Sequence, residues 1–166
     1  MAHPSLHVST ICTGNICRSP MAEVVLRHLI AEDAFLKDHV VVTSAGTARW
    51  HVGSPMDPRA RGALDRAGFQ LPGSLAIYAD AAYLRRQDFV VVMTREHRRD
   101  IHGRVKPTTE VLLWRNLLEP GLDLDVPDPY YGDERDFDEC LATFRAAGPR
   151  LTSVLRQRRG ERSYEV

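Results

Sequence analysis

The sequence predicts an α/β fold built around a parallel β-sheet, with helices on both faces of the sheet. Two observations support this prediction. Short apolar segments rich in β-branched residues alternate with segments of helical periodicity, which is typical of parallel strands connected by helices. The segment Phe89–Met93 is apolar at every position, as in a strand that is covered on both faces. Crossovers between such strands are right-handed, and ligands bind beyond the carboxyl ends of the strands.

The first predicted strand is Leu6–Ile11, which ends at a loop that begins with Cys12. A helix follows the loop. Ser19 fits its N-cap, Pro20 fits its first position, and Glu23 adds negative charge near its N-terminus. Apolar residues that recur every four positions give this helix one buried stripe, formed by Met21, Val25 and Leu29.

The second predicted strand is Val40–Thr43, bounded by Ser44–Gly46. Asp57 and Pro58 then begin a helix by the same capping logic, and Gly68 ends it. The buried face of this helix is predicted to consist of Ala60, Ala63, Leu64 and Ala67.

The second half of the chain completes the alternation. Ala81–Arg86 is predicted as a short helix and Phe89–Met93 as the third strand. Thr94 is expected to cap another short helix, and Glu110–Trp114 is predicted as the fourth strand. We expect Gly148-Pro149 to kink or interrupt a last helix. That helix is predicted from the spacing of Phe137, Cys140, Leu141, Phe144, Leu151, Val154 and Leu155.

Length and composition favour one globular domain over residues 1–166, with a core of about residues 6–157 and frayed ends. The chain has 166 residues, with 22 Lys and Arg against 22 Asp and Glu, so its formal net charge is zero. This balance gives no reason to expect nucleic acid binding. No apolar run approaches the ~18 residues of a membrane helix, and no signal peptide is visible.

The three cysteines of the chain are an odd number, which argues against a disulfide scaffold and for reduced thiols. We therefore expect a cytoplasmic protein, although the sequence leaves open an export route that needs no visible signal. We also expect a monomer without a cofactor and without a membrane partner.

The loop after the first strand has the composition of a binding site for a tetrahedral anion. Successive backbone N–H groups in a tight loop form a concave nest, and the following helix points its N-terminal donors at the same place. The guanidinium of Arg18 matches two phosphate oxygens, and Gly14 allows unusual backbone conformations. The predicted phosphate-binding residues, besides Cys12 and Arg18, are Thr13, Gly14, Asn15, Ile16, Cys17 and Ser19.

Cys12 is the predicted nucleophile at the floor of this nest. Positive potential from the helix terminus and from Arg18 favours the thiolate, which is placed to attack phosphorus and form a phosphocysteine. Ser19 could donate a hydrogen bond that helps the thiolate to leave in the second step. Taken alone, Cys12 reads as a buried thiol and Arg18 as a solvated charge; their combination in this context favours catalysis.

The other two cysteines have less specific interpretations. Cys17 is either a small packing residue or the partner of Cys12 in a reversible, protective disulfide. Cys140 lies on the apolar stripe of the last helix and reads as a core residue. The Cys12–Cys17 spacing and the absence of a second ligand pair do not fit a zinc site, so no metal is predicted.

The reaction also needs an acid that protonates the leaving group and a base that activates water. Asp128 is a candidate because the prolines on both sides of it stiffen the loop. A plain Asp-Pro turn explains the same residues, and Asp123 and Asp125 are equally acidic. The residues alone do not choose among the three.

These segments together resemble the low-molecular-weight protein tyrosine phosphatases. The resemblance spans residues 6 to about 157 and rests on motifs that stand in the family's order. Trp50–Gly53 further resembles the actinobacterial branch of the family. The family motifs are Val8–Glu23, Thr43–Thr47, Asp57–Ala60 and Asp128–Gly132.

The resemblance implies a flavodoxin-like, three-layer sandwich with a four-stranded parallel sheet, and hydrolysis of phosphotyrosine in proteins with release of inorganic phosphate. It implies Cys12 as nucleophile, Arg18 as phosphate clamp and Asp128 as general acid and then base. Asn15 would hold the loop through hydrogen bonds that involve Ser44. An aromatic rim of Trp50, His51, Tyr130 and Tyr131 would form a slot that is deep enough for phosphotyrosine but too deep for phosphoserine.

Two similar families differ from this chain at particular positions. Arsenate reductases of this fold carry further redox cysteines, whereas residues 80–102 contain no Cys. Protein-arginine phosphatases tend to have Thr in place of Ile16, and Phe-Gly in place of Tyr130-Tyr131. Thr94, where many tyrosine phosphatases have Asp, instead resembles the arginine-phosphatase variant. Protein-arginine phosphatase and thiol-redox activity therefore remain the alternatives.

Overall fold

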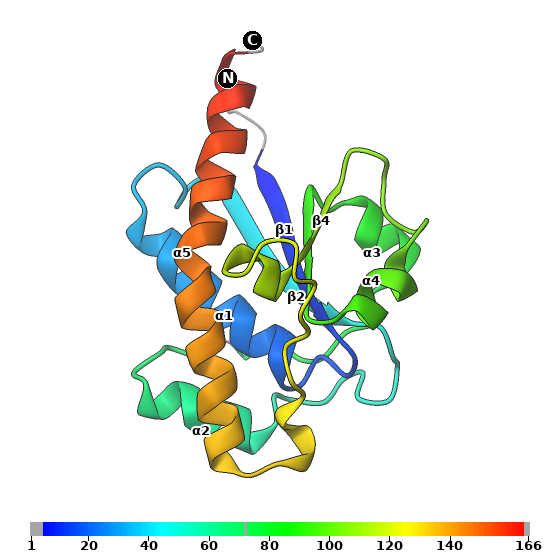
Figure 1. Cartoon of the computed structure of the whole chain (residues 1–166), viewed down its shortest axis with the longest axis vertical. Helices are drawn as coiled ribbons and strands as arrows, with labels where there is room; N and C mark the ends of the chain where they lie inside the picture. The colour runs from blue at the N-terminus through cyan, green and yellow to red at the C-terminus, as the bar shows by residue number, and fades with distance from the viewer. Residues whose placement is uncertain (1–4, 72, 165–166) are drawn as a thin grey trace.

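The computed structural model describes residues 5–71 and 73–164. Its centre is a parallel sheet with the strand order β2-β1-β3-β4 (Figure 1). The strands are β1 (Leu6–Cys12), β2 (Val40–Gly46), β3 (Phe89–Val92) and β4 (Glu110–Leu113). The predicted four-stranded parallel sheet is confirmed.

Helices cover both faces of the sheet, which confirms the predicted three layers (Figure 1). The larger group is α1 (Arg18–Glu32), α2 (Pro58–Arg66) and α5 (Glu134–Tyr164), in which α5 packs on both other helices. The opposite face carries α3 (Ala81–Arg85) and α4 (Arg95–Ile101).

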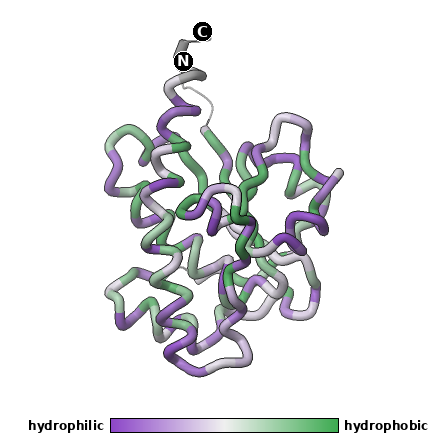
Figure 2. Tube along the Cα trace, in the orientation of Figure 1, coloured by the Kyte–Doolittle hydropathy of each residue, from purple (hydrophilic) through white to green (hydrophobic). Residues whose placement is uncertain are grey.

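The sheet separates two apolar cores, and β3 contributes to both. Phe89 and Val91 pack into the core beneath α1 and α5, whereas Val90 and Val92 pack into the core beneath α3 and α4. This double burial is the reason that the strand is apolar at every position. Figure 2 shows hydrophobic residues gathered on the central strands.

Local capping signals predicted two helix starts correctly. Asp57 accepts a hydrogen bond from the backbone N–H of Arg59 at the start of α2. Thr94 accepts one from the N–H of His97 at the start of α4. Gly68 follows α2 with a φ of 82°, the left-handed conformation that favours glycine after a helix.

The start of α1 differs from the prediction. The N-cap is Cys17, without a side-chain cap, and Ser19 lies inside the first turn with its hydroxyl turned toward Cys12 and Asn15. Glu23 is buried and bound to Ser44 rather than placed as a surface charge at the helix end. Both side chains are held by tertiary contacts that capping preferences do not describe.

Gly148 and Pro149 lie inside α5 and do not interrupt it, so of the two predicted effects, a kink or an interruption, the interruption is wrong. A Cβ on Gly148 would lie 2.5 Å from Cδ1 of Leu29, so the glycine allows α5 to approach α1 closely. The helix continues to Tyr164, so it includes most of the segment after Arg156 that was predicted to be frayed, whereas residues 1–4 and 165–166 lie outside the described residues. Despite this length, no helix among the described residues is apolar enough to span a membrane.

The ends of two strands differ from the prediction. Strand β2 runs to Gly46 rather than ending at Thr43, and Gly46 stands opposite Cys12 in the register of the sheet. Trp114, which begins a short 3-10 helix after β4, is completely buried and packs edge-to-face on Phe144, with ring centroids 5.0 Å apart.

Candidate active site

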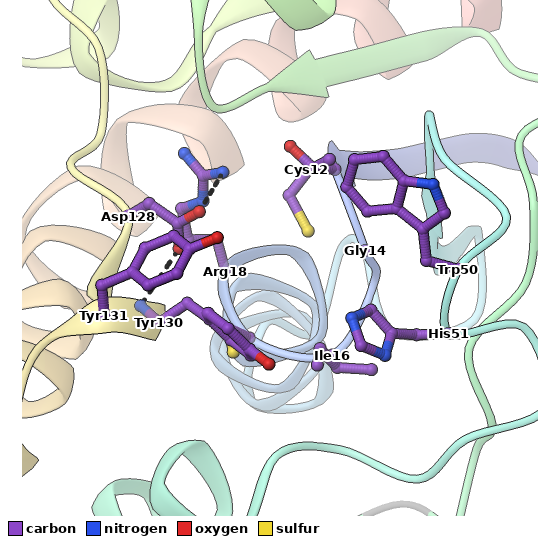
Figure 3. A pocket seen from close by; sticks show the side chains of 11 residues that line it. Cys12, Gly14, Ile16, Arg18, Trp50, His51, Asp128, Tyr130 and Tyr131 are labelled. Carbon is purple, nitrogen blue, oxygen red and sulfur yellow. Dashed lines mark hydrogen bonds and ion pairs between the residues drawn. The ribbon is translucent and has the colours of Figure 1, made fainter.

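A cavity of about 170 Å³ opens at the carboxyl end of β1. Figure 3 shows the Cys12 sulfur between Arg18 and Asp128 on one side and Trp50 and His51 on the other. The cavity is lined by Cys12, Thr13, Gly14, Ile16, Cys17, Arg18, Trp50, His51, Asp128, Tyr130 and Tyr131. Of the predicted site residues, all but Asn15 and Ser19 therefore line it.

Two groups of the loop hold the sulfur of Cys12. The backbone N–H of Asn15 donates to Sγ over 3.3 Å, and Oγ of Ser19 lies 3.0 Å from Sγ. Asn15 has a φ of 56°, the left-handed region that asparagine tolerates better than most residues. This turn of the backbone brings its N–H back to the preceding strand end, so the loop offers hydrogen bonds to a thiolate.

The side chain of Asn15 holds the loop from behind. Its Nδ2 donates to Oγ of Ser19 over 2.8 Å and to Oγ of Ser44 over 2.9 Å, the second being the contact that the resemblance implied. Its Oδ1 accepts from the N–H of Ile77. Ser44 in turn donates to Oε2 of Glu23 over 2.5 Å. Every polar atom of the Asn15 amide is thus engaged, which fixes its orientation.

The close approach of β2 adds a steric constraint. A Cβ on Gly46 would lie 2.5 Å from the carbonyl oxygen of Thr13, which is a backbone atom and has no rotamer to move to. On the cavity side, a Cβ on Gly14 would lie 2.8 Å from Cδ2 of His51. Glycine at these two positions therefore lets the loop lie between the sheet and the His51 ring.

Arg18 connects the loop to the segment that carries Asp128. Its guanidinium is buried, and it donates to the carbonyl of Val126 over 3.1 Å and to Oδ2 of Asp128 over 3.2 Å. The side chain of Asp128 remains 41% exposed at the cavity. A buried cation beside an accessible carboxylate can bind an oxyanion and exchange protons with a ligand.

The structure separates the three acidic candidates. Asp123 and Asp125 do not line the cavity and instead pair with Arg98 and Arg95 on α4. Hydrogen bonds from Asn116 and Arg98 lower the pKa of Asp123. Burial opposes the ionisation of Asp125, but hydrogen bonds from Arg95 outweigh it and lower the pKa of that carboxyl too. Of these three carboxylates, only that of Asp128 faces the cavity.

Aromatic side chains line the opening of the cavity. Trp50 is 80% exposed and Tyr131 91% exposed on opposite sides of the cavity (Figure 3). Tyr130 packs edge-to-face against Tyr131, with ring centroids 5.0 Å apart. Unlike a core tryptophan, Trp50 therefore exposes its ring to solvent at the cavity.

Comparison of the chain with known proteins shows to which family it belongs. The family model described as low molecular weight phosphotyrosine protein phosphatase matches residues 7–160. The chain belongs to this family. A low molecular weight protein-tyrosine-phosphatase of Streptomyces coelicolor is 41% identical over 156 residues, covering 90% of this chain and 93% of that protein.

Further relatives agree. The low molecular weight protein-tyrosine phosphatase A of Mycobacterium tuberculosis is 41% identical over 149 residues, covering 88% of this chain and 89% of that protein. The crystal structure of a protein tyrosine phosphatase from Entamoeba histolytica superposes with a TM-score of 0.82 at 25% identity, covering 95% of this chain and 99% of that chain. The predicted resemblance to low molecular weight phosphatases, with relatives in actinobacteria, is confirmed.

The remaining cysteines of this family member are free thiols. Burial and the nearby carboxylate of Asp57 raise the pKa of Cys17, which lines the cavity. Burial raises the pKa of Cys140 to about 12, in agreement with its prediction as a core residue on α5. The described residues contain no group of three or more His, Cys, Asp or Glu that could hold a metal ion.

Sequence reasoning missed three side chains that support the site of this low molecular weight phosphatase. His97 contacts Thr13 from α4, and Glu23 closes the Asn15 network. Arg59 donates from α2 to the carbonyls of Tyr130 and Gly132. Glu23 and Arg59 lie inside family motifs, but their contacts join segments far apart in the chain, and no local pattern predicts them.

Proposed function

We propose that this chain is a protein-tyrosine phosphatase that hydrolyses phosphotyrosine in proteins through a phosphocysteine, with Cys12, Arg18 and Asp128 as its catalytic residues. The observation that carries the proposal is the position of the Cys12 sulfur. It lies at the N-terminus of α1 in a cavity shared with Arg18 and Asp128, and it is held by two hydrogen-bonding groups. Membership of the phosphatase family supports the same reaction.

The first step is the transfer of the phosphoryl group to sulfur. The N-cap of α1 has no side-chain hydrogen bond, so the first N–H groups of the helix are left for the phosphoryl oxygens, together with the guanidinium of Arg18. The Cys12 thiolate attacks phosphorus, and the S–P bond forms as the P–O bond to the tyrosyl group breaks. Protonated Asp128 donates its proton to the departing phenolate oxygen.

The second step releases inorganic phosphate. The Asp128 carboxylate takes a proton from a water molecule as that water attacks phosphorus, and the S–P bond breaks to regenerate the thiolate. Oγ of Ser19, 3.0 Å from Sγ, stabilises the thiolate as a leaving group. Asn15 donates to Oγ of Ser19, so the hydroxyl hydrogen of Ser19 is available to an acceptor. The sulfur of Cys12 at 3.0 Å is a nearer acceptor than the carbonyl oxygen of Ala45 at 3.4 Å.

The aromatic rim supports phosphotyrosine as the substrate. Trp50 and Tyr131 stand on either side of the cavity, so the flat ring of a phosphotyrosine can lie between them while its phosphate group faces Cys12.

The free thiols support a reducing compartment, and we propose a cytoplasmic monomer.

The test is phosphate release from phosphotyrosine, phosphoserine and phosphoarginine peptides in the presence of a chelator. We expect release from phosphotyrosine only, and its loss in Cys12→Ser. Cys140→Ser is the matched control, because Cys140 is an equally buried thiol outside the cavity. Release mainly from phosphoarginine, or thiol-dependent reduction without phosphate release, would replace the proposal with one of the alternatives.

Asp128→Asn tests the acid separately. We expect turnover of phosphotyrosine to fall by roughly 10²–10⁴-fold, the usual contribution of a general acid, while phosphate binding changes little. Turnover equal to that of the wild type would remove Asp128 from this role.

A further inference from the structure

His97 is a buried histidine that touches the nucleophile loop without lining the cavity. It projects from α4, is 2% exposed, and places Nε2 2.8 Å from Oγ1 of Thr13. Thr13 directly follows Cys12 and lines the cavity. A neutral polar pair thus connects the second layer of helices to the residue next to the proposed nucleophile.

The surroundings of the ring decide which nitrogen carries the proton. Nδ1 of His97 is buried and has no hydrogen-bond partner among the residues that the structure describes. A buried N–H without a partner is rarer than an unpaired acceptor, so the arrangement favours the tautomer with the proton on Nε2. In that tautomer His97 donates and Oγ1 of Thr13 accepts.

This direction has a consequence for Thr13. Its hydroxyl has one donor hydrogen, which the bond from His97 does not use. Within the described residues, Thr13 Oγ1 makes no second hydrogen bond. The hydroxyl hydrogen is therefore left for a group in the cavity that Thr13 lines, where the proposed function puts the phosphoryl oxygens.

Resting on the proposed function, we propose that His97 is a positioning residue: it holds the Thr13 hydroxyl so that this group donates to the phosphoryl group of the substrate. Without the ring, the hydroxyl would rotate and use its hydrogen elsewhere. His97 itself stays out of the proton transfers, because it touches neither the cavity nor Asp128.

The charges around His97 agree with a role that needs no proton exchange. Arg18 on α1 and Asp125 on the segment before Asp128 are the charged groups that act on the ring, and they have opposite signs. Burial is the larger influence and keeps the imidazole neutral. The hydrogen bond to Thr13 is consequently the same across the neutral pH range.

The test uses two substitutions of His97 that differ in their hydrogen bonding. His97→Phe keeps an aromatic ring, slightly larger than imidazole, and removes the donor, whereas His97→Gln replaces Nε2 with an amide N–H. For each variant we would measure kcat and KM for a phosphotyrosine peptide and, by calorimetry, the Kd of inorganic phosphate. His102→Phe is the matched control, because His102 is an exposed residue at the other end of α4.

We expect His97→Phe to weaken phosphate binding and to lower kcat/KM by roughly three- to tenfold, as for the loss of one neutral hydrogen bond. His97→Gln should recover most of this loss, and His102→Phe should match the wild type. Thr13→Val removes the hydroxyl and keeps a side chain of similar size. It should show the same loss, and the double variant Thr13→Val/His97→Phe should lose no more than either single variant.

The outcomes separate this inference from the proposed function. Wild-type protein that binds phosphate but does not cleave the phosphotyrosine peptide would overturn the function. Cleavage by the wild type with unchanged phosphate affinity in His97→Phe would overturn the role of His97. Equal losses in His97→Gln and His97→Phe, or additive losses in the double variant, would also overturn it, because a merely structural ring would give those results.

Discussion

The stability of the fold should depend on pH through His97, and the size of this dependence follows from its burial. Burial, reinforced by the positive charge of Arg18, lowers the pKa of His97 from the ordinary 6.5 to about 3. The unfolded chain therefore binds a proton below about pH 6.5 that the folded chain does not bind until about pH 3. The free energy of unfolding therefore falls as the pH falls from about 6.5 to about 3. Above this range both states hold a neutral His97, and the residue causes no loss of stability.

The expected magnitude is about 1.4 kcal/mol for each pH unit below the unfolded pKa, or about 2 kcal/mol between pH 7 and pH 5. Other groups titrate over the same range, so the comparison is with His97→Gln, which lacks the titrating group. We would measure urea unfolding of both proteins at pH 7 and pH 5. The wild type should lose about 2 kcal/mol more than the variant.

Parallel losses in the two proteins would refute this reasoning. They would mean that the folded protein takes up a proton at His97 as readily as the unfolded chain does. The neutral imidazole that the proposed bond to Thr13 requires would then be wrong as well.

Three other perturbations test separate parts of the site. Gly46→Ala puts a methyl group against the Thr13 carbonyl, so the free energy of unfolding in urea should fall by about 1–3 kcal/mol. Phosphatase activity should fall as well, because the displaced loop carries Cys12. Asp57→Ala removes the N-cap of α2 and should lower stability by about 0.5–2 kcal/mol, measured by thermal unfolding. Asp125→Asn weakens the anchor of the Asp128 segment on α4, so kcat should fall more for phosphotyrosine than for an aryl phosphate with a good leaving group; equal effects on both substrates would contradict this coupling.

The order of strands and helices was predictable because its signals are local. Asp57 and Thr94 mark helix starts because their side chains accept hydrogen bonds from N–H groups two or three residues later. These contacts lie within one short segment and need no distant residue. The apolar run of β3 likewise indicates burial on both faces of the sheet, because every one of its residues is apolar. Elements defined by their own residues are the ones that sequence reasoning placed well.

The errors occurred where a distant segment decides the outcome. Ser19 has the chemistry of an N-cap, but Asn15 and Cys12 engage its hydroxyl. Gly148 and Pro149 look like an interruption, yet α1 packs against α5 at Gly148 and the helix continues. Propensities describe a segment alone, and tertiary packing overrides them at these positions.

The site shows the same division. The motif around Cys12 is one continuous segment and was readable as a phosphate-binding loop. The choice of Asp128 over Asp125 was not readable from the residues, because it depends on which carboxylate α4 engages. His97 has no sequence signal at all, since its importance lies in a contact with Thr13 across 84 positions of the chain.

The two tryptophans differ in solvent exposure, so their intrinsic fluorescence can report two different events. Trp114 is sealed in the core against Phe144, so its fluorescence should shift to longer wavelengths only when the fold opens. Trp50 stands in solvent at the mouth of the cavity, so its emission should respond when an aromatic ligand stacks beside it. Replacing either indole with phenylalanine leaves one reporter, and occupancy and unfolding can then be followed separately without an attached dye.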